Sequence, residues 1–118
     1  DREVTFWGTG TPRREFLHVD DMAEASLLLL DAQRPDEIVN IGSGEDIAIA
    51  ELAELVRGVV GFTGRVAWDA SKPDGMPRRR LDVTRLFSHG WRPRISLADG
   101  IASTYAWYRE NLGRLRTK

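Results

Sequence analysis

The pattern of apolar and polar positions predicts helices separated by short strands. Apolar residues recur every three to four positions over residues 49–60 and again over residues 97–112, which is the spacing of one helix face. Over residues 20–32 the apolar residues are nearly continuous, and such a helix needs cover on several sides. A shorter helix is expected over residues 83–89, and the tail from residue 114 onward is expected to fray.

Residues with capping chemistry mark where these helices begin and end. Asp20 or Asp21 is expected to cap the first helix, and Ser96 opens a capping-box pattern before the last one. Gly61 is expected to end the second helix in a left-handed conformation. Gly113 is expected to end the last helix.

Four short segments have the composition of β-strands: residues 4–7, 16–19, 38–41 and 65–69. Because they alternate with the helices, they predict an α/β lobe with three to four helices. Strands this short would gain stability by pairing with strands elsewhere.

Composition indicates one globular domain and excludes several kinds of site. The chain has 118 residues, and its net charge of -1 gives no electrostatic case for nucleic acid or an anionic membrane. The absence of cysteine excludes disulfides, thiolate metal sites and a cysteine nucleophile. His18 and His89 are not at metal-ligand spacing. No apolar run reaches transmembrane length. The first residues lack an initiator Met and a signal-peptide pattern, so the chain is expected to be a piece of a longer protein, and a cytoplasmic location is expected.

The stretch from Lys72 to Arg80 carries the most suggestive chemistry. It joins a turn, the carboxylate of Asp74 and three consecutive arginines. Arginine binds phosphate through a planar fork of donors, whereas a carboxylate serves hydroxyls or amides, so a loop with both suits a nucleotide-sugar. The alternative is a solvated basic turn. Trp7 is similarly open, because it could stack on a base or sugar or pack in the core.

Motifs for cofactor binding and catalysis are incomplete. The glycine turn at residues 42–44 lacks the third glycine of a dinucleotide fingerprint, which would fall at Ile47, so a tight turn is expected there. Tyr105 and Tyr108 have no lysine four residues later. His18 could be a catalytic base, but a hydrogen-bonded structural histidine is the stronger expectation.

Taken together, several segments resemble the GDP-L-fucose synthase family of extended short-chain dehydrogenases. They are residues 7–23, 40–44, 51–53, 72–75 with Pro77 and Arg78, 81–86, 90–91 and 102–105. The Arg-Glu-Phe-Leu-His-Val-Asp-Asp run is shared widely among extended short-chain dehydrogenases. The Lys-Pro-Asp-Gly loop followed by Pro-Arg is more specific to the fucose synthases.

The resemblance implies an NADP-dependent epimerase and reductase that converts GDP-4-keto-6-deoxy-D-mannose to GDP-L-fucose. In that family the dinucleotide-binding glycines and the catalytic residues precede the segment matched here. Residues 1–118 are therefore expected to form a C-terminal substrate-binding domain with no catalytic, cofactor-binding or metal-binding residue. NADP would be bound by the missing Rossmann half, the isolated chain would be inactive, and the intact protein would be a homodimer.

Three positions match substrate contacts of the family, and a fourth can add to them. Trp7 matches a tryptophan that lies against the nucleotide-sugar, and Arg14 matches the arginine on the pyrophosphate. Asp74 matches a loop aspartate that contacts substrate, through ribose hydroxyls or the guanine edge as we expect. Arg79 occupies a position that is often lysine and can add a second charge to the diphosphate. Arg13 replaces an apolar residue, so one of the neighbouring arginines 13 and 14 is expected to be solvated.

Three alternatives stay open. The chain could be a stand-alone nucleotide-sugar-binding or protein-interaction module whose apolar first helix is an interface. It could be the lobe of a related epimerase or dehydratase that acts on another nucleotide-sugar. Binding of single-stranded nucleic acid through tryptophan and arginine is the third, and the net charge of -1 argues against it.

Overall fold

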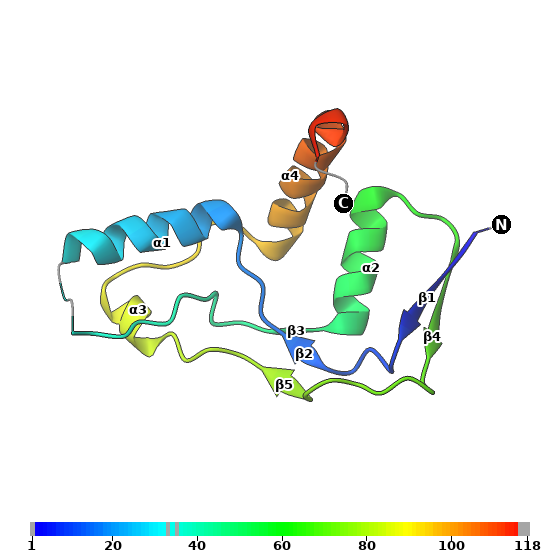
Figure 1. Ribbon diagram of the computed structural model, residues 1–118, viewed down its shortest axis with the longest axis horizontal. Coiled ribbons are helices and arrows are strands. Elements are labelled where there is room, and N and C mark those ends of the chain that lie inside the picture. Colours follow the sequence, from blue (N-terminus) through cyan, green and yellow to red (C-terminus); the bar gives the residue numbers. More distant parts are fainter. Residues whose placement is uncertain (1, 33, 35, 116–118) are drawn as a thin grey trace.

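The chain forms an α/β lobe of short strands and helices, shown as a computed structural model in Figure 1. The structure describes residues 2–32, 34 and 36–115, so the end of the tail that was expected to fray, residues 116–118, lies outside them. In chain order the elements are β1 (Glu3–Trp7), β2 (Arg13–Arg14), α1 (Val19–Ala32), β3 (Ile47–Ala48), α2 (Ile49–Val60), β4 (Arg65–Asp69), β5 (Arg78–Arg79), α3 (Thr84–Ser88), α4 (Leu97–Glu110) and a 3-10 turn (Leu112–Arg114). The predicted fold class is confirmed.

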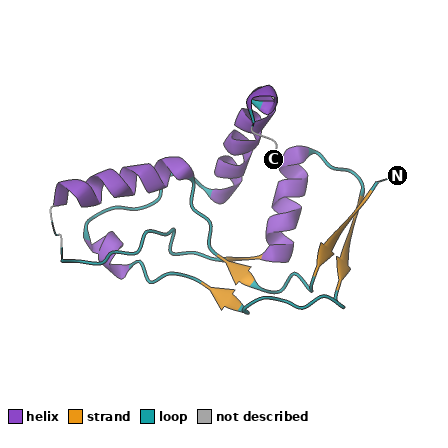
Figure 2. Ribbon diagram, in the orientation of Figure 1, coloured by secondary structure: helices purple, strands orange, loops and turns teal. Residues whose placement is uncertain are grey.

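The strands form two small sheets (Figure 2). The segment that carries β1 and then β2 contributes one strand to each sheet, and so does the segment that carries β4 and then β5. β1 and β4 pair in parallel, with Trp7 opposite Asp69. Further along, β2 pairs with β3 antiparallel and with β5 in parallel, with Arg13 opposite Arg78. The loop between β1 and β2 has five residues, and the loop between β4 and β5, residues 70–77, has eight. The second loop therefore spans the same gap between the sheets with three extra residues.

The buried core is small and lies where α1, α3 and the segment after α3 meet. Ala25, Leu86 and Trp91 are buried there, and partly buried apolar side chains pack around them. The accessible surface is 9038 Å², against about 6,500 Å² for a compact monomer of this mass. The radius of gyration is 17.2 Å, against about 13 Å for a compact domain of this length. The chain therefore covers much less of itself than a compact domain does.

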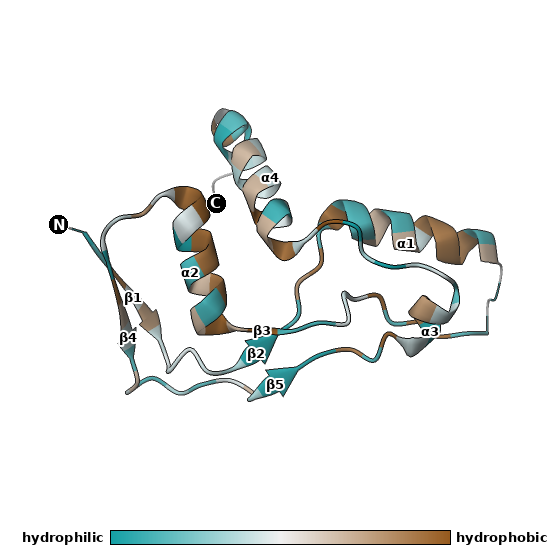
Figure 3. Ribbon diagram, turned by 180° about the vertical axis from the view of Figure 1, so that it is seen from behind, coloured by the Kyte–Doolittle hydropathy of each residue, from teal (hydrophilic) through white to brown (hydrophobic). Residues whose placement is uncertain are grey.

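Helix α1 shows most clearly what the chain leaves uncovered. Val19, Met22, Leu27 and Leu30 each have at least half of their surface exposed, and the ribbon of α1 carries hydrophobic colour along its length in Figure 3. The described part of the chain leaves these apolar side chains uncovered, so the need of this helix for cover on several sides stays a prediction.

Helix ends follow the sequence in part. Gly61 ends α2 with φ 75°, and the hydroxyl of Ser96 accepts from the amide of Asp99 at 3.2 Å before α4, both as predicted. The expectation that Asp20 or Asp21 caps α1 is wrong, because Nδ1 of His18 accepts the Asp20 amide at 3.0 Å.

Two predicted strands are also wrong. Residues 16–19 contain no strand; instead Arg13 and Arg14, which precede them in the chain by one residue, form β2. Residues 38–41 run as irregular backbone: Val39 and Ile41 pack on the core, and the side-chain amide of Asn40 donates to the carbonyl of Asp82. Helix α4 ends before Gly113, where the side-chain amide of Asn111 donates to the carbonyl of Trp107 at 2.9 Å.

Candidate functional site

The two loops that follow β1 and β4 lie side by side because their strands are parallel. Parallel strands end at the same edge of a sheet, so the residues after Trp7 and after Asp69 leave from one place. The pairing of β2 with β5 then holds the far ends of both loops together. Segments about sixty residues apart in sequence are thereby joined at both ends of their loops, which run alongside each other in Figure 1.

Asp74 joins the two loops in their middle. Its carboxylate accepts from the amide of Thr9 at 2.9 Å and from the hydroxyl of Thr9 at 2.7 Å. These bonds hold the pKa of Asp74 below its ordinary value, and the bond from the hydroxyl contributes more than the bond from the amide. Gly8 allows the approach, because its φ is +91° and an added Cβ would lie 2.4 Å from Oδ1 of Asp74. Asp74 therefore has a structural contact, and its contact with a ligand stays a prediction.

Four arginines meet where β2 pairs with β5, and they fall into two pairs. Arg13 and Arg78 both donate through Nε to the carboxylate of Asp46, with 2.9 Å between Arg13 Nε and Oδ1. The side chain of Asp46 is only 4% exposed, and these bonds, the one from Arg78 first, hold its pKa below the ordinary value. Arg13 is therefore ion-paired, and the expectation that one of arginines 13 and 14 is simply solvated is wrong for Arg13.

The other pair, Arg14 and Arg79, has no carboxylate partner among the described residues. Nη1 of Arg14 donates to the carbonyls of Arg13 and Met76, both at 2.7 Å. Nη2 of Arg79 lies 3.6 Å from the sulfur of Met76. Both guanidiniums thus lie against Met76, with donors left over for an anion. We call Arg14 and Arg79 the free arginine pair.

Trp7 lies at the start of the same loop and is 75% exposed, so the core-packing alternative for it is wrong. The ammonium of Lys72 lies 5.3 Å from the centre of its ring. An exposed indole beside the ammonium of Lys72 offers a flat surface for a planar group.

The four predicted site residues therefore belong to one pair of joined loops. Sequence reasoning missed Thr9 and Asp46, although the structure gives each an essential contact. Thr9 lies inside the segment that resembles the family, so the loop itself was visible. Asp46 had no signal, because nothing local distinguishes it from the neighbouring Glu45.

The glycine turn at residues 42–44 does not fit a dinucleotide. Gly44 has φ 82°, as a tight turn requires, and its amide donates to the carboxylate of Glu15 at 2.8 Å. A Cβ on Gly42 would lie 2.7 Å from the same carboxylate. The amide that a pyrophosphate would need is thus already bound to an anion. This chain offers NADP no fitting cradle there, and we derive no chemical step through that cofactor.

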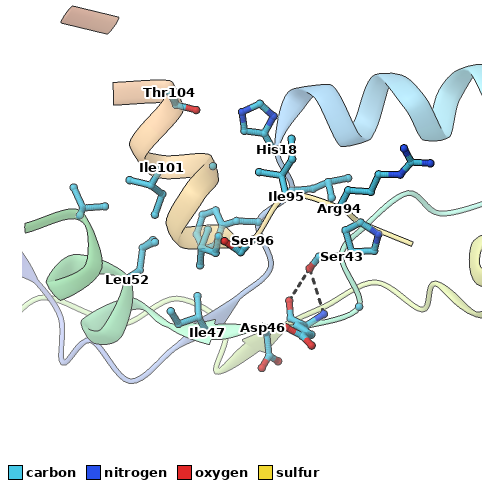
Figure 4. Close-up of a pocket in the computed structure, with 18 of the residues that line it drawn as sticks. His18, Ser43, Asp46, Ile47, Leu52, Arg94, Ile95, Ser96, Ile101 and Thr104 are labelled. Atoms are coloured by element: carbon cyan, nitrogen blue, oxygen red, sulfur yellow. Dashed lines mark hydrogen bonds between the residues drawn. The ribbon is translucent and has the colours of Figure 1, made fainter. Parts of the chain in front are cut away.

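Away from this site, a groove lies between α2 and α4 (Figure 4), with a volume of about 1240 Å³. Its walls are mainly apolar, with Leu52 on α2 and Ile101 on α4 facing one another across it. Ser43 lines its edge and bonds the backbone of Glu45, and none of the four predicted site residues takes part. Among its polar lining residues, His18, Ser43 and Asp46 already bond to other protein groups, so the groove indicates packing rather than chemistry.

His18 has a structural role, as expected. Besides accepting the Asp20 amide, its ring lies 3.2 Å from the hydroxyl of Ser103, which ties α1 to α4. Within the described ranges, no three acidic or histidine side chains gather as a metal site requires. No helix in the described part of the chain is long and apolar enough to span a membrane.

Comparisons with known proteins agree with the resemblance seen in the sequence. The model of the NAD dependent epimerase/dehydratase family matches residues 1–42. GDP-L-fucose synthase 1 of Arabidopsis thaliana is 56% identical over 110 residues, which is 93% of this chain and 34% of that protein. GDP-L-fucose synthase of Escherichia coli is 51% identical over 123 residues, covering 97% of this chain and 38% of that protein.

Solved structures show the same relationship. A GDP-mannoheptose C4 reductase from Campylobacter jejuni with NADP bound is 38% identical, with a TM-score of 0.78 over 92% of this chain and 35% of that one. The chain thus spans about a third of the length of the relatives it matches. Over nearly all of its own length, this chain is related in sequence and fold to the GDP-L-fucose synthases.

Proposed function

We propose that this chain is the C-terminal substrate-binding part of a longer NADP-dependent enzyme that converts GDP-4-keto-6-deoxy-D-mannose to GDP-L-fucose. In this proposal Trp7, Arg14, Asp74 and Arg79 hold the GDP portion of the substrate. The single observation that carries it is the free arginine pair, because two guanidiniums without a carboxylate partner suit a diphosphate. Relatives at 51% and 56% identity that are named for GDP-L-fucose support the choice of nucleotide.

The chain supplies binding energy rather than chemistry. Gripping the diphosphate, which lies far from the reacting sugar carbons, fixes the sugar where the rest of the enzyme can act, and this orientation lowers the barrier. NADPH would supply the hydride, and the longer protein's remaining part would bind it, since the glycine turn here is occupied by Glu15. The intact protein is proposed to be a cytoplasmic homodimer, and light scattering of the purified protein tests its assembly.

Calorimetric titration of the full-length protein tests the nucleotide. GDP should bind more tightly than UDP or dTDP, and Arg79→Ala should weaken GDP about ten-fold, the effect of losing one charge-assisted contact. Arg65→Ala, on the exposed end of β4, is the matched control and should leave affinity unchanged. Equal affinity for the three nucleotides would favour an enzyme for another nucleotide-sugar.

Activity of the isolated chain is a second test. We expect no oxidation of NADPH with the keto-sugar, and measurable oxidation by the pure chain would refute the division of labour proposed here.

A stand-alone interaction module is the second candidate, favoured by the exposed apolar side chains of α1. Mixing the chain with a separately produced remainder of the longer protein separates the two. Restored activity supports the enzyme part, whereas a stable complex with an unrelated partner and no activity supports the module.

A further inference from the structure

Strand pairing sorts the four arginines onto two faces. Side chains alternate along a strand, and Arg13 opposes Arg78 while Arg14 opposes Arg79. The first pair meets at Asp46 and the second lies against Met76. Which arginines are available to an anion is therefore decided by the register of two residues in each strand.

Few other contacts hold that register: Asp74 joins the neighbouring loops at Thr9, and Arg14 donates to the carbonyl of Met76. β5 is exposed and pairs with β2 over two residues only. Guanidiniums directly opposite one another repel, which opposes the pairing. One buried carboxylate offsets this, since separate oxygens of Asp46 accept from Arg13 and from Arg78, and the backbone carbonyl of Asp46 accepts a further bond from Nη2 of Arg13 at 3.2 Å. Asp46 immediately precedes β3, so it ties all three strands together.

We propose that Asp46 is a positioning residue: by joining Arg13 to Arg78 it sets the spacing of Arg14 and Arg79, so that these two grip one diphosphate together. Asp46 itself does not touch the ligand. This role rests on the proposed function, because it concerns the same nucleotide site.

The sign of the effect distinguishes positioning from simple electrostatics. Removing a negative charge near an anion site should tighten anion binding if only Coulomb forces act. Removing Asp46 should instead weaken binding, because β5 and the guanidinium of Arg79 move away from Arg14.

The test is calorimetric titration of GDP into full-length Asp46→Asn protein. We expect affinity to fall about ten-fold, as when one of two charge-assisted contacts is lost. In the double variant Asp46→Asn/Arg79→Ala the loss should be no greater than for Arg79→Ala alone, because Asp46 acts through that residue. Glu54→Gln, which breaks the exposed ion pair of Glu54 with Arg57 on α2, is the matched control and should bind GDP normally.

Each outcome decides between the two proposals. Unchanged or tighter GDP binding in Asp46→Asn, with weakened binding in Arg79→Ala, overturns the positioning role and leaves the nucleotide site standing. Additive losses in the double variant also overturn it. A wild-type protein that does not bind GDP overturns both. If Asp46→Asn fails to fold, Arg78→Gln cuts the same tie from β5 and should show the same non-additive loss with Arg79→Ala.

Discussion

The site around the four arginines of β2 and β5, here called the arginine site, differs from helix α1 in how completely the chain supplies contacts to the side chains. At the site, Asp46, Asp74 and Thr9 complete a polar network drawn from segments far apart in sequence. On α1, Leu27 and Leu30 remain 64% and 72% exposed. Polar groups need only a few well-placed atoms, whereas apolar burial needs area, and the surface of this chain is too large for its mass. The polar network is therefore complete where the core is not.

The largest expected effect comes from the buried side of this comparison. Leu86 on α3 is fully buried in the core that it shares with Ala25 of α1, so Leu86→Ala should lower the free energy of unfolding by about 3 kcal/mol. The matched control Leu30→Ala, on the exposed face of α1, should cost less than about 0.5 kcal/mol in the isolated chain. Urea unfolding of both variants measures this, and equal losses would contradict the contrast.

The same control sharpens the comparison in the full-length protein. If the remainder of the enzyme covers α1, Leu30→Ala should cost about 2 kcal/mol there, since a buried leucine then leaves a cavity. A cost that stays near zero in the full-length protein would mean that α1 is exposed there too.

A polar anchor on α1 should have the next largest effect. Asp21 is 2% exposed, and its carboxylate accepts from the amides of Arg94 and Ile95. Asp21→Ala should lower the free energy of unfolding by about 2 kcal/mol, because two buried amides lose a charged acceptor. Its exposed neighbour provides the control, Asp20→Ala, with an expected change below about 0.5 kcal/mol. Thermal unfolding of the two variants distinguishes them.

Acid should loosen the arginine site. The pKa values of Asp46 and Asp74 are lowered in the fold, so their stabilisation is present above the ordinary aspartate value of about 4 and lost as pH falls through the lower folded values. The wild type should therefore lose more stability between pH 5 and pH 3 than an Asp46→Asn/Asp74→Asn variant. Urea midpoints at the two pH values measure this, and parallel losses would argue against it.

The smallest expected effect concerns Thr9. Thr9→Ala removes the hydroxyl that contributes most to lowering the pKa of Asp74, so that pKa should rise toward its ordinary value. Carboxyl chemical shifts of Asp74 followed against pH by NMR report the change. Thr63→Ala, on an exposed turn, should leave the titration of Asp74 where it is.

Much of the local structure followed from the sequence because the forces that set it are local. The apolar spacing of α2 and α4, the left-handed Gly61 and the cap at Ser96 each depend on residues within one or two turns. β1 and β4 were equally visible as short runs of strand-forming residues. The family resemblance rests on the order of residues along the chain, and the comparisons confirmed it.

Tertiary structure alone decided what has no local pattern. Two-residue strands such as β2 and β5 carry no periodicity, so the sequence could place Arg13 and Arg14 side by side but could not say which of them is neutralised. Residues 38–41 look like a strand, yet they pack on the core without a pairing partner. Asp46 becomes important only in the fold, where Arg13, about thirty residues before it, and Arg78, about thirty residues after it, meet at its carboxylate. The sequence by itself determined the helices and the family resemblance, and it predicted the site residues. The fold decided which guanidiniums are free, because strand register and burial are properties of contacts between distant segments.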